Sequence, residues 1–174
     1  MTAVILPDHK VNGAVLSLAS NVAPAVHLAA CRQTLAGMST LTLSAIHQNA
    51  CQLADEYPQV QVAPYHNQIA VVAFNGTMAY ATLWQLTKQL ERDNGRQTCT
   101  KPNVTLDVDI LAVRTPTPSS ALAAALPDAP VEVVIPRGDW QLLARRLPLP
   151  SYDKAGLASL PMPWAHTLQA LFDV

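Results

Sequence analysis

Two carboxylates, Asp107 and Asp109, stand two residues apart in the stretch TLDVDIL, residues 105–111. Successive side chains on a strand point to opposite faces, so both carboxylates would share one face and the apolar side chains the other. Carboxylates this close repel each other, and a hard cation such as Mg²⁺ removes that repulsion in sites for phosphate chemistry. The same alternation is the ordinary pattern of a half-buried strand with a solvated outer face. This stretch alone therefore leaves two interpretations open, a metal site and a plain strand.

The composition is that of a globular protein with enough apolar residues for a sizeable core. The chain has 174 residues, of which 50% are hydrophobic and 13% charged, and its formal net charge is −1. This length predicts one domain over residues 1–174. No block of basic residues favours nucleic acid, and no stretch reaches the roughly 18 uninterrupted apolar residues of a membrane span. We therefore expect a monomer that binds neither nucleic acid nor a membrane.

The cysteines and the N-terminal residues indicate the compartment. Cys31, Cys51 and Cys99 have neither the even number of a disulfide framework nor the spacing of a zinc site. Asp8 and His9 follow only a short apolar run, which does not fit a signal peptide. These patterns favour a reducing compartment, and we expect the protein in the cytoplasm.

Hydrophobic periodicity predicts four strands and two helices in the order strand, helix, strand, strand, helix, strand. The first helix would place Leu28, Cys31, Leu35 and Met38 at core positions. The order is typical of a ferredoxin-like α+β fold, an antiparallel sheet with helices packed on one face. The predicted strands span residues 14–18, 41–46, 69–74 and 105–111, and the helices follow Asn21 and Thr77.

Turn and proline signals predict the remaining segments. Asn75 and Gly76 would turn the chain after the third strand, Thr77 would cap the second helix, and Gly95 would end it. A segment rich in Pro and Ala would form an excursion at residues 116–130, with a short helix at 120–126. The other predicted segments are a strand at 131–135, a helix at 139–146, an irregular stretch at 148–163 and a closing helix at 164–172.

Four segments, taken in order, resemble the 6-hydroxymethyl-7,8-dihydropterin pyrophosphokinase family, whose members move diphosphate from ATP to a pterin alcohol. The most specific is TLDVDI at residues 105–110, which is similar to the family signature Thr-Leu-Asp-Leu-Asp-Ile. The resemblance covers roughly residues 12–172, and it implies one domain of this type with an inserted Pro/Ala-rich segment near 114–130. The other three segments are LSLASN at 16–21, YHN with IAVV at 65–72, and LE with GR between 90 and 96.

The resemblance implies a catalytic centre on the signature strand. Asp107 and Asp109 would hold two Mg²⁺ ions that bridge the ATP phosphates, and Arg96 would approach the phosphates. Diphosphate transfer needs positioning, metal and positive charge more than covalent help from the protein. A pair of carboxylates with a nearby arginine supplies this minimum.

The resemblance also implies two binding regions. Tyr65 would pack on the pterin ring, and Asn67 would read its amide edge, because an Asn amide both donates and accepts hydrogen bonds. Glu91 would lie near the nucleotide, and the Ile110 backbone would read the adenine. The family has Val-Pro-His-Tyr-Asp ahead of an arginine. In the best register, residues 135–139, Arg137 stands in place of the histidine and would contact ATP, and residues 150–153 form a competing register that also lacks the histidine.

The chain departs from the family pattern just before the signature strand. The family has Arg-Trp-Gly-Pro-Arg there, whereas this chain has TKPNV at residues 100–104. A tryptophan over the pterin is therefore absent, and Val104 replaces an arginine. A lost phosphate contact that acts in the transition state lowers a rate by about 10² to 10³. The sequence leaves three hypotheses open: a slow pterin diphosphokinase, a non-catalytic paralogue that keeps the ligand pocket, and an interaction module that uses residues 116–130.

Overall fold

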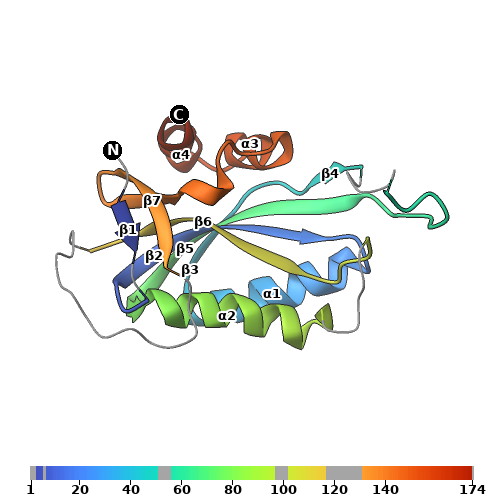
Figure 1. Ribbon diagram of the computed structural model, residues 1–174, viewed down its shortest axis with the longest axis horizontal. Coiled ribbons are helices and arrows are strands. Elements are labelled where there is room, and N and C mark those ends of the chain that lie inside the picture. The colour runs from blue at the N-terminus through green and yellow to red at the C-terminus, as the bar shows by residue number, and fades with distance from the viewer. Residues whose placement is uncertain (1–2, 6, 51–55, 97–101, 117–130, 174) are drawn as a thin grey trace.

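The computed structural model describes residues 3–5, 7–50, 56–96, 102–116 and 131–173, which form three layers (Figure 1). An antiparallel sheet lies in the middle, with two helices on each face, so the α+β fold class is confirmed. The predicted insertion is outside the described residues from residue 117 onward, and so is its short helix. No helix in the described part of the chain is long and apolar enough to cross a membrane.

The sheet has the strand order β1-β7-β8-β6-β2-β5-β3, with β4 added beside β5. All of its pairs are antiparallel. The long strand β2 lies at its centre, between β5 and β6. The strands are β1 Ala3–Ile5, β2 Lys10–Ser20, β3 Ser39–Leu43, β4 His47–Asn49, β5 Tyr65–Ala79, β6 Asp107–Arg114, β7 Glu132–Arg137 and β8 Trp140–Leu143.

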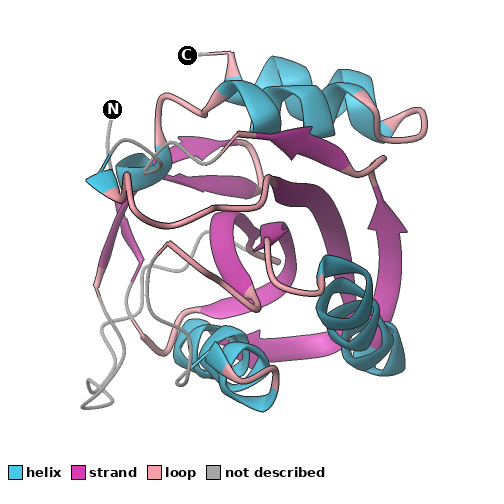
Figure 2. Cartoon of the chain, turned by 90° about the vertical axis from the view of Figure 1, so that its right-hand side faces the viewer, coloured by secondary structure: helices cyan, strands magenta, loops and turns pink. Residues whose placement is uncertain are grey.

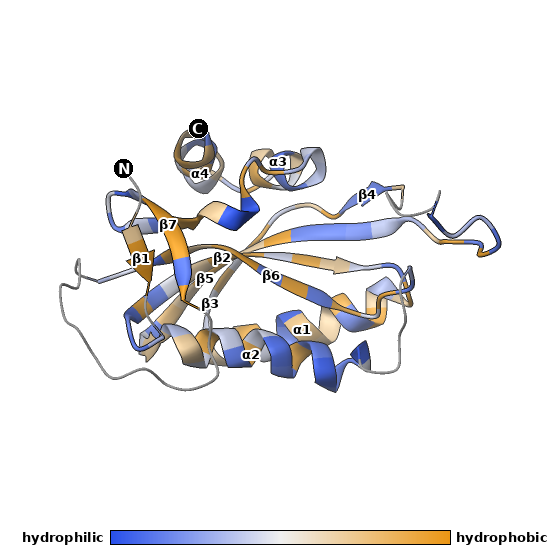
Figure 3. Cartoon of the chain, viewed as in Figure 1, coloured by the Kyte–Doolittle hydropathy of each residue, from blue (hydrophilic) through white to orange (hydrophobic). Residues whose placement is uncertain are grey.

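Helices α1, Pro24–Met38, and α2, Tyr80–Asp93, cover one face of the sheet (Figures 1 and 2). As predicted, Leu28, Cys31 and Leu35 of α1 are fully buried against the sheet. The turns of α2 alternate between hydrophilic and hydrophobic residues (Figure 3), which keeps its apolar residues on the core side. Gly95 follows the end of α2 with a φ of 78°, a conformation that glycine adopts without strain.

Helices α3, Ser151–Ala158, and α4, Trp164–Phe172, cover part of the opposite face (Figure 2). A second apolar core lies beneath them. A Cβ at Gly156 would lie 2.6 Å from Ile69 Cγ1, so glycine lets α3 approach β5 closely. The predicted closing helix at 164–172 is confirmed by α4.

The predicted turn at Asn75 and Gly76 is wrong, because β5 continues to Ala79. Residues 74–77 of β5 lie opposite Asn12 alone, since Gly13 pairs with Ala73 and Val11 with Met78. The turn residues therefore produce an irregularity within the strand instead of reversing the chain. Helix α2 accordingly begins at Tyr80, with no side-chain cap, and not after Thr77.

The predicted helix at 139–146 is also wrong, because the segment forms strand β8 and the short 3₁₀ helix η3, Ala144–Arg146. Arg137 pairs with Trp140, which leaves a two-residue hairpin loop at Gly138 and Asp139. Gly138 has a φ of 64°, as such tight loops require. The segment at 148–163 was predicted to be irregular, but it contains α3, since Pro150 precedes the helix and Pro161 follows it.

Candidate functional site

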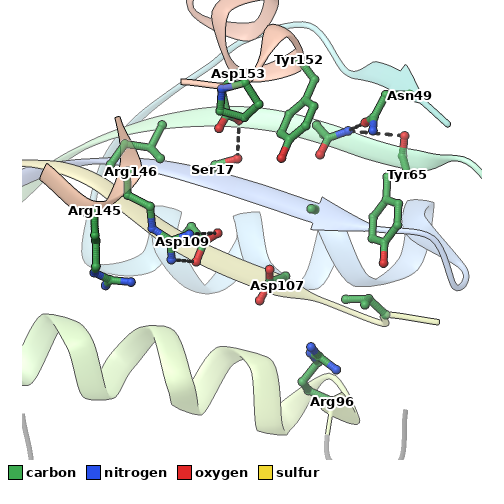
Figure 4. Close-up of a pocket in the computed structure, with 15 residues that line it drawn as sticks. Ser17, Asn49, Tyr65, Arg96, Asp107, Asp109, Arg145, Arg146, Tyr152 and Asp153 are labelled. Carbon is green, nitrogen blue, oxygen red and sulfur yellow. Dashed lines mark hydrogen bonds and ion pairs between the residues drawn. The ribbon is translucent and has the colours of Figure 1, made fainter. Parts of the chain in front are cut away.

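A cavity of about 360 Å³ opens on the sheet face that carries α3, and Tyr152 and Asp153 of that helix are among its lining residues (Figure 4). Its walls come from β2, β4, β5 and β6, the end of α2, η3 and the start of α3. The volume is within the range of roughly 300 to 1,000 Å³ that is common for small-molecule pockets. Five of the eight residues singled out in the sequence line this cavity: Tyr65, Asn67, Arg96, Asp107 and Asp109.

Strand β6 presents Asp107 and Asp109 to the cavity, as its alternation predicted. Val108 and Ile110 point into the core under α1 and α2. The register places Asp109 opposite Ser17 and Asp107 opposite Ala19, a small residue that leaves space above the strand. The shared face of the two carboxylates is therefore confirmed.

The two carboxylates have different surroundings. Arg146 Nη1 donates to Asp109 Oδ2 at 2.7 Å, and Arg146 Nη2 donates to Asp109 Oδ1. Burial and the charge of Asp107 raise the pKa of Asp109, while Arg146 opposes that shift. No described residue donates a hydrogen bond to Asp107 or forms an ion pair with it. Asp109 is thus engaged within the protein, whereas Asp107 keeps its oxygens available.

A third carboxylate, Asp153, enters the site from α3 and is only 5% exposed. Ser17 Oγ donates to its Oδ1 at 2.6 Å. Burial raises the pKa of Asp153 to about 6, although the Ser17 hydrogen bond favours the charged form. From the sequence, Asp153 occurs only in the competing register at residues 150–153, because the prolines around it predicted an irregular stretch instead of a helix that faces the sheet.

Three arginines line the cavity, and two of them were not expected from the sequence. Arg145 and Arg146 come from η3, which follows β8 beside β6. Arg145 Nε donates to the buried Glu132 at 2.8 Å. Arg96 follows α2 and reaches the cavity from the opposite side (Figure 4). Positive charge therefore surrounds the carboxylates even though Val104 replaces an arginine.

The other end of the cavity is polar and aromatic. Asn67 is buried, and its Nδ2 donates to Asn49 Oδ1 and to the His47 carbonyl, the latter at 3.4 Å. Tyr65 donates its hydroxyl to the Pro102 carbonyl at 2.8 Å. Tyr152 of α3 lines the same end and was not assigned a role from the sequence. This end thus has the buried amide of Asn67 and the half-buried amide of Asn49 beside aromatic rings.

Three of the singled-out residues lie outside the cavity lining. Glu91 accepts hydrogen bonds from Lys88 at 2.7 and 2.9 Å and from the Val108 backbone N–H at 3.1 Å, which ties α2 to β6. The Ile110 side chain is buried in the other core. Arg137 is exposed in the β7–β8 hairpin. It pairs with Trp140 of β8, and Trp140 pairs in turn with Arg114 at the C-terminal end of β6. That end is roughly 23 Å from Asp107 at the usual rise of a strand.

The carboxylates of the cavity provide some, but not all, of the oxygen ligands that a hard divalent cation needs. Mg²⁺ is commonly held by one or two carboxylates together with substrate phosphate oxygens. Asp107 fits this role as it stands, whereas both oxygens of Asp109 accept from Arg146. Within the described ranges, no three His, Cys, Asp or Glu side chains are grouped to hold a metal by themselves. The protein side of such a site is therefore small, and a ligand would have to supply the remaining oxygens.

Comparison with known proteins gives one family. The family model described as 7,8-dihydro-6-hydroxymethylpterin-pyrophosphokinase matches residues 15–152. The matched region runs from β2 to the start of α3 and contains all the lining residues named above except Asp153. No curated protein matches the chain.

Proposed function

Because the chain belongs to the 7,8-dihydro-6-hydroxymethylpterin-pyrophosphokinase family, we propose that it transfers diphosphate from ATP to 6-hydroxymethyl-7,8-dihydropterin. One observation carries the proposal. A single cavity joins an end with buried amides and aromatic rings to an end with carboxylates and arginines. The first suits a flat heterocycle with a donor and acceptor edge, and the second suits a polyphosphate.

At the pterin end, Asn67 and Tyr65 keep the roles that the resemblance implies. The Asn67 Nδ2 already donates to Asn49 Oδ1 and to the His47 carbonyl, so the amide is held in place and offers its Oδ1 to a donor on the ligand. Tyr65 is held through its hydroxyl by the Pro102 carbonyl, which orients the aromatic side chain in the cavity wall. Tyr152 lines this end from α3 and offers a second aromatic surface.

At the phosphate end, the protein positions the reactants and stabilises charge. The pterin alcohol oxygen forms a bond to the β-phosphorus of ATP, the bond from that phosphorus to the oxygen on the α-phosphorus breaks, and AMP leaves. Arg96 and Arg145 line the cavity and stabilise negative charge on the moving diphosphate. Mg²⁺ held through Asp107 would neutralise phosphate charge and fix the geometry of the polyphosphate. Glu91 is proposed to support the nucleotide region indirectly, by holding α2 against β6.

We propose the fold type, the oligomeric state and the compartment together with the activity. The elements β2, α1, β3, β5, α2 and β6 follow the β-α-β-β-α-β order, and their strands lie in the order β6-β2-β5-β3. This arrangement supports a ferredoxin-like fold with additional strands and helices. We propose that the protein acts as a monomer in the cytoplasm. The contact surface of the third hypothesis, residues 116–130, lies outside the described residues from residue 117 onward.

The direct test measures AMP release from ATP in the presence of 6-hydroxymethyl-7,8-dihydropterin and Mg²⁺. We expect AMP to form only when the pterin is present. The Asp107→Asn variant should lose at least about 100-fold in kcat/KM. Arg114→Gln is a matched control, because Arg114 lies on the same strand but pairs with Asp139 in an exposed ion pair. Folded wild-type protein that releases no AMP above the enzyme-free rate would contradict the proposal.

One observation favours the alternative, a non-catalytic paralogue that keeps the pocket. Arg146 engages both oxygens of Asp109, a carboxylate that the family uses for metal by the resemblance. Calorimetry separates the two functions. Binding of the pterin together with failure to bind a non-hydrolysable ATP analogue would support the paralogue. Binding of both ligands together with AMP release would support the enzyme.

A further inference from the structure

We propose that Arg146 takes the place of one of the two divalent cations at the phosphate end of the cavity. The site would then carry one metal ion, at Asp107, and one guanidinium, fixed on Asp109. The nucleotide part of this inference rests on the proposed function, whereas the competition between Arg146 and a metal ion does not.

The contact between Arg146 and Asp109 is a two-point one. Nη1 and Nη2 of the guanidinium each donate to a different oxygen of the Asp109 carboxylate. This is the paired geometry that arginine forms with carboxylates and that lysine cannot reproduce. Each Asp109 oxygen keeps one further lone pair, so a metal ion that binds there must either lie beside the guanidinium charge or displace one of these hydrogen bonds. The guanidinium therefore disfavours a metal ion at Asp109, through repulsion of like charges and through competition for the oxygens.

The fold places Arg146 at this position in advance. Strand β8 pairs with β6 through Leu142 and Ala112, and η3 continues directly from β8. The neighbouring Arg145 is fixed by its ion pair with the buried Glu132. Arg146 and Asp109 are each 27% exposed in their side chains. The Arg146 backbone follows directly from a paired strand, and its guanidinium is held by Asp109, so we count this side chain as part of the site.

The charges around Asp109 also favour the binding of one metal ion in addition to the Arg146 guanidinium. Asp107, Asp109 and Asp153 bring three carboxylates to the cavity wall, and Arg146 is the cation that contacts one of them there within the described ranges. Nearby, Lys88 is paired with Glu91, and Arg145 with Glu132. Since Asp107 has no donor among the described residues, its oxygens are the available ligands. A divalent ion would bind at Asp107, beside a charge that Arg146 already supplies.

The remaining donors of Arg146 can serve a phosphate. A guanidinium has five N–H groups, and Asp109 uses two of them. Arg146 Nε is buried without a partner in the described structure, and the side chain lines the cavity. Arg146 can thus contact Asp109 and a phosphate oxygen at the same time, as a bridging metal ion would. This role would restore one of the phosphate contacts that the substitution at Val104 removes.

The first experiment needs no nucleotide. Mn²⁺ binding is measured by electron paramagnetic resonance for the wild type, Arg146→Gln and the control Arg114→Gln, which removes the same charge from the far end of β6. We expect Arg146→Gln to bind Mn²⁺ at least 10-fold more tightly than the wild type, and the control to stay within twofold. Equal affinities in Arg146→Gln and the control would overturn the proposal.

Two further variants keep the test valid if Arg146→Gln does not fold. Arg146→Lys retains the charge but cannot span both oxygens, and we expect its Mn²⁺ affinity to rise about threefold. An unchanged affinity in a folded Arg146→Lys protein would contradict the proposal. Adding Asp109→Asn to either variant should cancel the gain, because it removes the released ligand. A gain that persists in the double variant would also contradict it.

The second experiment counts metal ions with a non-hydrolysable ATP analogue at saturation. We expect one Mn²⁺ per chain in the wild type and two in Arg146→Gln. Two ions in the wild type would refute the replacement. Failure of every variant to bind the analogue would contradict the proposed function, and the nucleotide-free comparison would then decide the role of Arg146 alone.

Discussion

The two faces of the sheet are built from the same strands but have opposite chemistry. Under α1 and α2, the face is closed and apolar, and Val108 lies within it. On the other face, α3 and α4 cover only part of the sheet, and Asp109, the next residue along the chain, lines an open cavity. A strand can thus contribute to stability with one set of side chains and to binding with the other, because the two sets never meet.

Burial has different consequences on the two faces. It raises the pKa of the Cys31 thiol to about 12 in the closed core, where no polar partner is in contact with the thiol among the described residues. It raises the pKa of Asp153 to about 6 on the cavity face, where Ser17 still donates to the carboxylate. The closed face is mostly apolar, and its buried carboxylate Glu91 is paired with Lys88. The cavity face holds several carboxylates, and burial raises the pKa of Asp153 among them. Substitutions on the closed face should therefore change stability alone, whereas those on the cavity face should change ligand or proton binding, with or without a change in stability.

The largest effect is expected on the closed face. Leu83 of α2 is fully buried there. Leu83→Ala should lower the free energy of unfolding by about 3 to 5 kcal/mol, because it removes buried apolar contacts and leaves a cavity. Urea unfolding followed by circular dichroism measures this change. Mn²⁺ binding per folded molecule should stay the same, and a changed affinity would mean that the two faces are coupled.

Sequence periodicity predicted the buried residues of the closed face well, because each helix there packs on strands that are close to it in the sequence. Leu28, Cys31 and Leu35 recur at helical spacing, and the alternation in β6 correctly separates Val108 from Asp109. These patterns are local in the sequence, so they can be recognised without knowledge of the tertiary structure. The fold could be predicted from the sequence to this extent.

The cavity face was predicted only in part, because its remaining residues arrive through long-range pairing. Arg146 reaches Asp109 only when β8 pairs with β6, and the pattern of apolar residues around Trp140 and Leu142 fits a helix as well as a strand. The Gly138-Asp139 pair was the available signal for the hairpin, since it is a common two-residue loop. The resemblance did not point to Arg146 either, because the best register placed the family's histidine at Arg137.

The second prediction concerns the titration of Asp153. Its pKa is about 6 in the folded protein and roughly 3.9 in an unfolded chain. The folded state therefore binds the proton more tightly, and stability decreases as the pH rises from about 4 to about 6. Asp153→Asn should remove most of this decrease and be about 1 to 3 kcal/mol more stable than the wild type at pH 7. Urea unfolding at pH 4, 5, 6 and 7 measures it.

The control for this prediction is Ser17→Ala, which removes the donor to the Asp153 carboxylate. The loss of this hydrogen bond should raise the pKa of Asp153 further and steepen the decrease in stability toward pH 7. An Asp153→Asn protein that is less stable than the wild type at pH 7 would show that the ionised carboxylate stabilises the fold. The cavity face would then resemble a structural core more than a binding site.

A smaller effect is expected for Asp109→Asn, which breaks the two-point contact with Arg146. Breaking a fully buried pair costs about 3 to 5 kcal/mol. Since both side chains are 27% exposed, we expect a loss of about 1 to 2 kcal/mol here. Asp139→Asn is the matched control, because it breaks the exposed Arg114 pair and should cost less than about 0.5 kcal/mol. Equal losses in the two variants would mean that Arg146 is not fixed on Asp109.

The smallest effect on stability is expected for Asp107→Asn. No described residue bonds to this carboxylate, and its charge raises the pKa of Asp109, so the two carboxylates repel each other. Removing the charge should leave the free energy of unfolding within about 0.5 kcal/mol of the wild type, or raise it slightly. The same variant should lose Mn²⁺ binding, which calorimetry measures beside the melting temperature. Asp109 would then contribute to stability through Arg146, whereas Asp107, on the same face of the same strand, would bind the metal ion. A melting temperature that falls as far as that of Asp109→Asn would show instead that both carboxylates are structural, and it would remove the main support for a metal ion at this site.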